Sequence, residues 1–139
     1  VLIESKGITI KTLFKDDFYC ESDQHLLSII INNLISNALK YSKENGVIEI
    51  ELKQNSNQIE CTISDSGIGI PKTDLEKVFQ PFFRSNAATI SPEIKGIGIG
   101  LSIVQRLCSL LLIEVKITSE ENVGTKVNLS FLSKDLSNS

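Results

Sequence analysis

Four polar side chains lie along one side of a stretch with helical spacing. Asn33 and Asn37 are four residues apart, and Lys40 and Tyr41 follow within the next turn. At about 100° per residue they form a ridge at the edge of an apolar face. An amide oxygen is a ligand that Mg²⁺ accepts beside phosphates, a lysine adds a charge for phosphate, and a tyrosine can flank a flat ring. A solvated helix edge is the alternative, and spacing alone does not separate the two.

A carboxylate and two glycines directly follow a stretch with strand alternation. Apolar side chains at every second position up to Ile63 turn Asp65 toward the core side. A carboxylate there is costly unless a donor meets it, and the exocyclic amine of a purine is one candidate. Gly67 and Gly69, followed by Ile70, would let a ring approach the backbone without meeting a Cβ atom. The alternative is an Asx-turn in which Asp65 caps its own loop.

A second glycine-rich stretch opens another segment with helical spacing. Gly96, Gly98 and Gly100 place free backbone N–H groups beside a helix N-terminus, which favours an anion. No Gly-Lys-Ser/Thr follows, and Leu101 stands in place of a third Rossmann glycine, so neither of those two phosphate-binding motifs is present. Lys95 flanks the stretch and is a candidate partner of phosphate oxygens. A hinge without a ligand is the alternative.

An aromatic cluster precedes that stretch. Residues 79–84 combine three phenylalanines, beginning with Phe79, with a proline and Arg84. The irregular stretch from 81 to 95 is rich in Ser, Ala, Asn and Pro, which predicts a mobile loop. We expect the aromatic side chains to anchor one end of that loop. Arg84 could pair with phosphate oxygens, although single basic residues are most often solvated.

The elements that must position these residues alternate along the chain. This alternation predicts a layered α/β or α+β fold. The predicted strands cover residues 7–13, 18–20, 48–52, 59–63, 113–119 and 126–132. The predicted helices are a long one from an N-cap at Ser22 or Asp23 to Tyr41, a weakly helical piece at 71–79 and one from about Gly100. Gly124 and its neighbours are expected to form the last turn.

The length and composition of the chain limit the classes of protein to which it could belong. The 139 residues predict one domain over 1–133 with a polar tail or linker at 134–139. A net charge of −3 with few aromatic residues argues against nucleic acid. No apolar run is long enough to span a bilayer, and no signal segment opens the chain. Three scattered cysteines favour a reducing compartment. We therefore expect a cytoplasmic domain without membrane contact. Val1 and the absence of methionine are typical of a piece cut from a longer protein.

The order of these motifs resembles the catalytic and ATP-binding domain of bacterial sensor histidine kinases, within the superfamily of gyrase, chaperone, kinase and mismatch-repair ATPases. Residues 33–41 look like its N box, 65–70 and 96–101 like its two glycine boxes, and 79–84 like its F box. Gly124-Thr125 resembles the closing Gly-Thr element, so the resemblance covers residues 7–132. It implies a two-layer α/β sandwich of the Bergerat type, with a mixed sheet on about three helices and ATP beneath a lid at about 84–98.

The resemblance also implies roles for individual residues. Asn37 would ligate Mg²⁺, Asn33 and Lys40 would serve the phosphates, and Arg84 would complete the catalytic set. The other implied nucleotide contacts are Tyr41, Asp65, Gly67, Gly69, Ile70, Phe79, Lys95, Gly96, Gly98, Gly100, Leu101 and Thr125. Among these, Asp65 would accept the adenine amino group. Superfamily members that hydrolyse ATP carry a glutamate at the place of Asn33, so the resemblance implies phosphoryl transfer to another group.

That group would be a histidine outside this chain. His25 lacks the acidic neighbour and the proline of a phosphoacceptor motif. The implied partners are an upstream dimerisation and histidine-phosphotransfer domain and a response regulator, and the isolated chain would be a monomer that does not phosphorylate itself. A docking-only pseudokinase, a serine kinase of the anti-sigma type and a mechanical ATPase are the alternatives. The chain departs from the family pattern at two places. Ile97 stands where the family often has a small hydroxyl residue, and Leu111-Leu112 replace a turn that frequently contains glycine.

Overall fold

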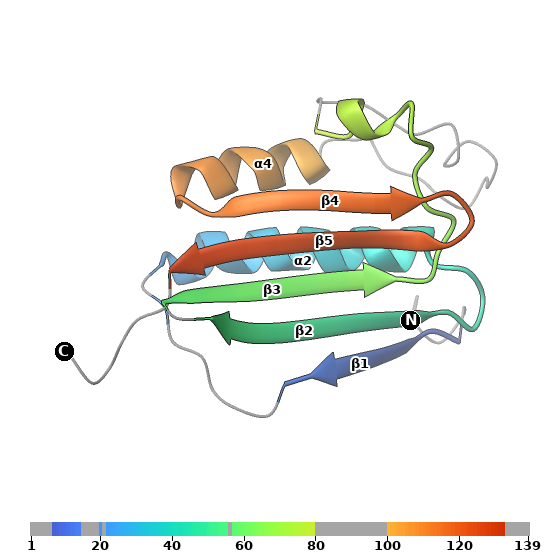
Figure 1. Cartoon of the computed structure of the whole chain (residues 1–139), viewed down its shortest axis with the longest axis horizontal. Coiled ribbons are helices and arrows are strands. Elements are labelled where there is room, and N and C mark those ends of the chain that lie inside the picture. Colours follow the sequence, from blue (N-terminus) through green and yellow to red (C-terminus); the bar gives the residue numbers. More distant parts are fainter. Residues whose placement is uncertain (1–6, 15–19, 21, 56, 80–99, 133–139) are drawn as a thin grey trace.

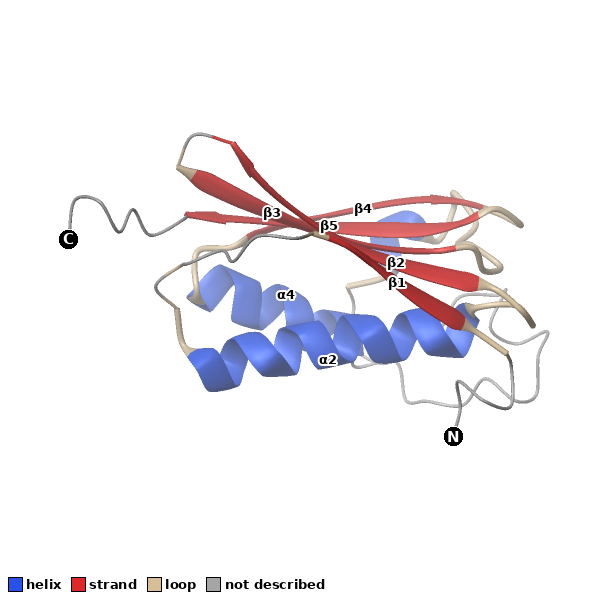
Figure 2. Cartoon of the chain, turned by 90° about the horizontal axis from the view of Figure 1, so that it is seen from below, coloured by secondary structure: helices blue, strands red, loops and turns tan. Residues whose placement is uncertain are grey.

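A mixed sheet lies on one layer of helices (Figures 1 and 2). The computed structural model describes residues 7–14, 20, 22–55, 57–79 and 100–132. Its five strands are β1 (Thr9–Leu13), β2 (Val47–Asn55), β3 (Gln58–Asp65), β4 (Glu114–Glu120) and β5 (Gly124–Leu132), in the order β1-β2-β3-β5-β4. Only β1 and β2 pair in parallel, and the other pairs are antiparallel. The predicted two-layer sandwich is confirmed.

The long helix α2 (Gln24–Tyr41) runs under the sheet. It begins at Asp23, whose side chain accepts a 2.9 Å hydrogen bond from the Leu26 N–H, so the N-cap is Asp23 and not Ser22. Ile30, Leu34 and Ala38 are buried at spacings of four residues and form the stripe that packs on the core. The polar ridge therefore lies at the edge of this packed face.

The second helix, α4 (Gly100–Leu110), packs against α2 and β4. Val104 and Cys108 are buried in the shared core, as their spacing predicts. The helix ends where Leu112 adopts a left-handed backbone with φ of 59°, and the Ile113 N–H donates to the Cys108 carbonyl at 2.8 Å. In the described residues the third predicted helix is a single 3₁₀ turn, η1 (Leu75–Lys77).

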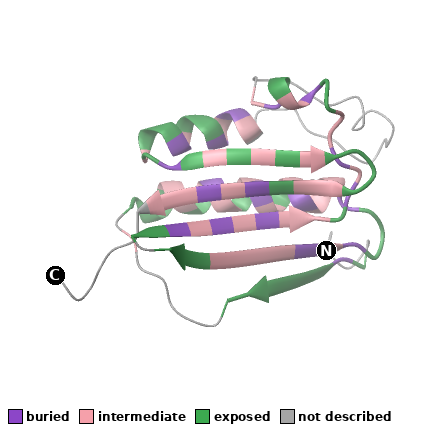
Figure 3. Ribbon diagram, viewed as in Figure 1, coloured by how far each residue is buried: buried purple, intermediate pink, exposed green. Residues whose placement is uncertain are grey.

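In the paired strands β3, β5 and β4, side chains at every second position face the helices, and this inward-facing row continues to the end of the sheet. Burial alternates along β3, while β1 at the sheet edge is exposed throughout (Figure 3). Asp65 pairs with Thr125 on β5, which pairs in turn with Ser119 on β4. Gly124 begins β5 instead of forming the turn, which occupies 121–123. Glycine is required at this position because a Cβ atom would collide with the Asp65 carbonyl oxygen.

Several expectations fall on other parts of the chain. The predicted strand at 18–20 lies outside the described residues except for Cys20, which is in no strand. The loop expected at 81–95 and the tail at 134–139 also lie outside them. None of the helices that the structure describes is long and apolar enough to cross a bilayer.

Candidate functional site

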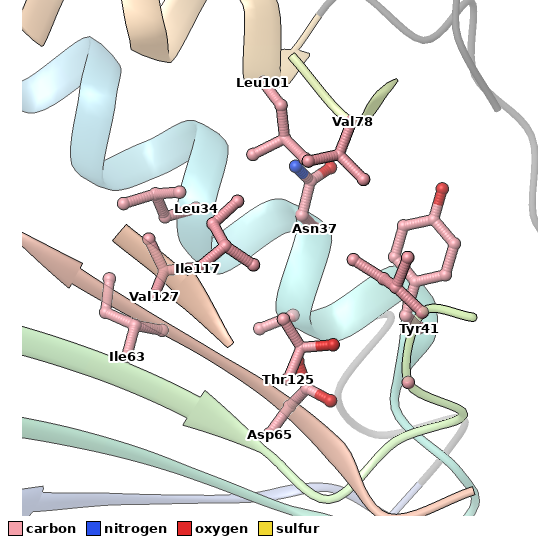
Figure 4. Close-up of a pocket in the computed structure, with 13 residues that line it drawn as sticks. Leu34, Asn37, Tyr41, Ile63, Asp65, Val78, Leu101, Ile117, Thr125 and Val127 are labelled. Carbon is pink, nitrogen blue, oxygen red and sulfur yellow. The ribbon is translucent and has the colours of Figure 1, made fainter. Parts of the chain in front are cut away.

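A pocket opens between the sheet and the C-terminal half of α2 (Figure 4). Strands β3, β4 and β5 form one side, and α2, the loop after β3, Val78 just after η1 and the start of α4 contribute to the rest. The lining residues are Leu34, Asn37, Ala38, Tyr41, Ile63, Asp65, Gly69, Ile70, Val78, Leu101, Ile117, Thr125 and Val127. Most of these side chains are apolar, and the polar ones lie at defined places.

The sheet side of the pocket is an apolar row. Ile63, Val127 and Ile117 pair with one another across β3, β5 and β4, so their side chains face α2 together. Leu34 and Ala38 approach from the helix. An apolar pocket with a few placed polar groups is the usual form of a small-molecule site, and this one suits a flat ring.

Asp65 and Thr125 provide the polar end, side by side one step further along the same strands (Figure 4). The Gly67 N–H donates to Asp65 Oδ1 at 2.9 Å. Burial raises the pKa of Asp65 to about 6, while the backbone N–H groups of Gly67 and Thr125 act to lower it. At neutral pH the carboxyl group is therefore ionised and can only accept hydrogen bonds.

The loop after Asp65 is held tightly between two other parts of the backbone. The Ile68 N–H donates to the Tyr41 carbonyl at 3.1 Å, and the Ile68 carbonyl accepts from the Asn122 N–H at 2.7 Å. A Cβ atom on Gly67 would collide with the Tyr41 carbonyl, and one on Gly69, whose φ is 71°, would collide with the Glu120 carbonyl. The two glycines are thus required by backbone packing, a requirement separate from the expected approach of a ring.

Only part of the polar ridge of α2 lines the pocket. Asn37 and Tyr41 line it, and the Asn37 amide lies close to Val78 and Leu101 in the view of Figure 4. Asn33 lies one turn earlier, and its Nδ2 donates to the Ile29 carbonyl at 2.8 Å, which leaves Oδ1 as its acceptor. Only the last turns of the ridge therefore reach the pocket.

The structure brings together about half of the expected site residues. Those that line the pocket are Asn37, Tyr41, Asp65, Gly69, Ile70, Leu101 and Thr125. Asn33, Lys40, Gly67 and Phe79 are described but do not line it, and Gly100 is the first residue of α4. Arg84, Lys95, Gly96 and Gly98 lie outside the described residues.

The motif-based expectation missed the apolar lining and one hydroxyl group. Ile63, Ile117 and Val127 belong to the lining, and the alternation of apolar residues in the predicted strands 59–63, 113–119 and 126–132 predicts all three on the core side. Continuing that alternation along β4 leads to Ser119, whose Oγ accepts from the Ile70 N–H at 2.8 Å. The alternation was thus the signal that could have added all four.

Asn37 is the described candidate metal ligand in this pocket. Among the residues that the structure describes, no group of three His, Cys, Asp or Glu side chains could hold a metal ion. A cation here would bring most of its ligands with it, as Mg²⁺ does when it binds phosphates and waters. A single amide at the pocket wall fits that mode of binding.

Comparison with known proteins gives the same family repeatedly. The family described as histidine kinase-, DNA gyrase B-, and HSP90-like ATPase matches residues 22–135. Sensor histidine kinase WalK of Bacillus subtilis is 34% identical over 128 residues, which are 91% of this chain and 21% of WalK. Sensor protein kinase GraS of Staphylococcus aureus is 38% identical over 126 residues, again 91% of this chain and 36% of GraS.

The fold is also that of a solved kinase structure. A mycobacterial sensor histidine kinase, MprB, superposes with a TM-score of 0.83 at 23% identity, over 97% of this chain and 90% of that one. The chain spans 21% and 36% of the lengths of WalK and GraS. It therefore belongs to the histidine kinase-, DNA gyrase B- and HSP90-like ATPase family, as an ATP-binding catalytic domain of the kind that sensor histidine kinases contain.

Proposed function

We propose that this domain binds Mg²⁺ and ATP and transfers the γ-phosphoryl group to a histidine on a separate dimerisation domain. The observation that carries the proposal is the ionised Asp65 beside Thr125 at the end of an apolar slot, with Asn37 on the opposite wall. This arrangement has one end for a purine amine and another for a metal and phosphates.

The end of the pocket at Asp65 and Thr125 is the proposed adenine site, and it contacts the ring through few residues. Asp65 is proposed to accept a hydrogen bond from the exocyclic amine of adenine, because its carboxylate lines the pocket and has lone pairs beyond those that the Gly67 and Thr125 N–H groups use. Ile63 and Val127 face one side of the ring, and Tyr41 flanks it at the pocket edge.

The phosphate end lies toward the start of α4. Leu101 lines the pocket one residue after the first residue of this 11-residue helix, so phosphates there would meet the positive end of the helix dipole. Asn37 is the proposed ligand of Mg²⁺, which when bound neutralises the developing charge of phosphoryl transfer. Other proposed phosphate contacts are Asn33, Lys40, Arg84, Lys95, Gly96, Gly98 and Gly100.

The polar side chains of the site favour phosphoryl transfer over hydrolysis of ATP, because none of those described at the phosphate end can act as a base toward water. Asp65 lies at the base end, and it is the carboxylate among the described lining residues. The amide groups of Asn33 and Asn37 cannot take a proton from water. An imidazole nucleophile brings its own lone pair and does not need a base from this domain.

The proposal assigns the rest of the reaction to other chains or domains. The phosphoryl acceptor is a histidine in an upstream dimerisation domain, and a response regulator takes the group afterwards. We place the domain in the cytoplasm, where ATP is available and where Cys20, Cys61 and Cys108 remain free thiols. In isolation it is a monomer.

A titration tests nucleotide binding and the metal ligand together. Calorimetry with a non-hydrolysable ATP analogue should give a complex that is tighter with Mg²⁺ than with EDTA. Asn37→Ala should still bind the analogue without its Mg²⁺ dependence. Asn32→Ala, which changes an exposed amide on the solvent side of the same helix, should behave as the wild type.

Each failure has a separate meaning. No binding by the wild-type chain would refute the proposed function and leave a docking-only pseudokinase. A Mg²⁺ dependence that persists in Asn37→Ala would refute only the role of Asn37.

A further inference from the structure

The Ser119 hydroxyl group connects the loop after β3 with the first two residues of β5. Its Oγ accepts from the Ile70 N–H at 2.8 Å, lies 3.0 Å from the Gly124 carbonyl oxygen and lies 2.8 Å from Thr125 Oγ1. Ile70 and Thr125 both line the pocket, whereas Ser119, on β4, is not among the lining residues. A change at Ser119 therefore acts on a ligand through its neighbours.

Counting protons assigns the direction of each bond. A serine hydroxyl has one proton and two lone pairs. A carbonyl oxygen can only accept, so the bond to Gly124 uses the Ser119 proton. The Ile70 N–H occupies one lone pair, and the remaining lone pair meets the Thr125 hydroxyl, which must then be the donor.

This direction fixes what Thr125 offers to the pocket. With its proton committed to Ser119, the Thr125 hydroxyl presents lone pairs to a ligand. Its cross-strand neighbour Asp65 is also an acceptor when ionised. The polar end of the pocket then consists of two adjacent acceptors, which suits an amine and opposes a carbonyl oxygen.

We propose that Ser119 is a positioning residue that holds Thr125 as a hydrogen-bond acceptor and so makes the pocket select 6-aminopurine over 6-oxopurine nucleotides. The inference rests on the proposed nucleotide binding and adds a determinant of base specificity to it. An oxopurine places its O6 atom against both acceptors, and a freed Thr125 proton would remove half of that conflict.

The test compares ADP with IDP, which carry an amino and an oxo group at C6 and differ also in the proton that hypoxanthine has on N1. Calorimetry should show that the wild-type chain prefers ADP. In Ser119→Ala the Thr125 hydroxyl can turn and donate to O6, so the affinity for IDP should rise and the preference should fall by about tenfold, the effect of one hydrogen bond to a buried partner. Ser119→Thr keeps the hydroxyl and should restore the preference.

Two more variants make the result decisive. Ser130→Ala changes a serine on β5 whose side chain belongs to the opposite, outward-facing row and should leave both affinities unchanged. Thr125→Val removes the acceptor itself and should lower the affinity for ADP, which gives a second test if Ser119→Ala does not fold. An unchanged preference in a folded Ser119→Ala or Thr125→Val overturns the inference while ADP binding still supports the proposed function. Absence of ADP binding by the wild type would refute both.

Discussion

At the scale of single residues, Asp65 shows how a binding group can oppose folding. Burial raises its pKa from 3.8 to about 6, so the folded chain binds this proton more tightly than the unfolded chain does. The contribution of Asp65 to stability is therefore fully present below about pH 4 and is lost as pH rises through 6. At neutral pH the ionised carboxylate destabilises the ligand-free domain, and a bound amine would offset that cost.

Replacing Asp65 with Asn should separate binding from stability. The amide can still accept from the Gly67 N–H, but it carries no charge to desolvate. We expect the thermal midpoint at pH 7.5 to rise by about 2–4 °C, the shift for about 1 kcal/mol in a chain of this size. The affinity for ADP should fall at least about tenfold with the loss of the charged acceptor. Calorimetry at pH 7.5 measures both effects.

The pH dependence of this variant provides the control. The difference in thermal midpoint between Asp65→Asn and the wild type should shrink as pH falls from 6 toward 4, because the wild-type carboxyl group is then protonated. A difference that is constant over this range would contradict the assigned cause. An ADP affinity within about twofold of the wild type would contradict the base contact.

Some of the site was open to prediction from sequence because side-chain direction in a strand alternates. Ile63 and its alternating neighbours placed Asp65 on the core side correctly. The contacts of Ser119 were not predictable in the same way, since Ile70 lies 49 residues from it and only strand register brings the two together. Asn33, which does not line the pocket, donates to the Ile29 carbonyl, and spacing alone does not specify that hydrogen bond.

At the scale of elements, the end of α4 shows a local conflict that the fold tolerates. Leu112 occupies the left-handed position where glycine is usual, with φ of 59°, and its side chain is 89% exposed. Such a backbone costs a non-glycine residue about 1–2 kcal/mol, and an exposed leucine gains little by burial. The unusual Leu111-Leu112 sequence is therefore accommodated as a strained turn directly after α4, which ends at Leu110.

Leu112→Gly should stabilise the domain. Relief of the left-handed strain exceeds the added entropy of glycine in the unfolded chain, so we expect a gain of about 0.5–1 kcal/mol. Urea unfolding should show a higher midpoint with an unchanged slope. Leu110→Gly is the matched control, because Leu110 is 69% exposed but helical, and glycine there should lower the midpoint. A lower midpoint for Leu112→Gly would contradict the strain.

At the scale of the whole molecule, the pocket and the histidine lie near opposite ends of α2. His25 is exposed in the first turn of the helix, whereas Asn37 and Tyr41 line the pocket in its last turns. Twelve residues separate His25 from Asn37, which is about 18 Å along a helix axis at 1.5 Å per residue. A phosphoryl group bound beside Asn37 would therefore be far outside the reach of direct transfer to the imidazole, which requires about 3–3.5 Å.

This separation predicts that the chain acts only on a histidine supplied from outside. Incubated alone with labelled ATP, the domain should form no acid-labile phosphate. Added to a dimerisation domain from a related sensor histidine kinase, it should label that domain, and His25→Gln should transfer at the wild-type rate because the exposed imidazole lies away from the pocket. Labelling of the isolated chain that disappears in His25→Gln would contradict the prediction. It would mean that one copy presents His25 to the pocket of another, since the length of α2 prevents transfer within a single copy.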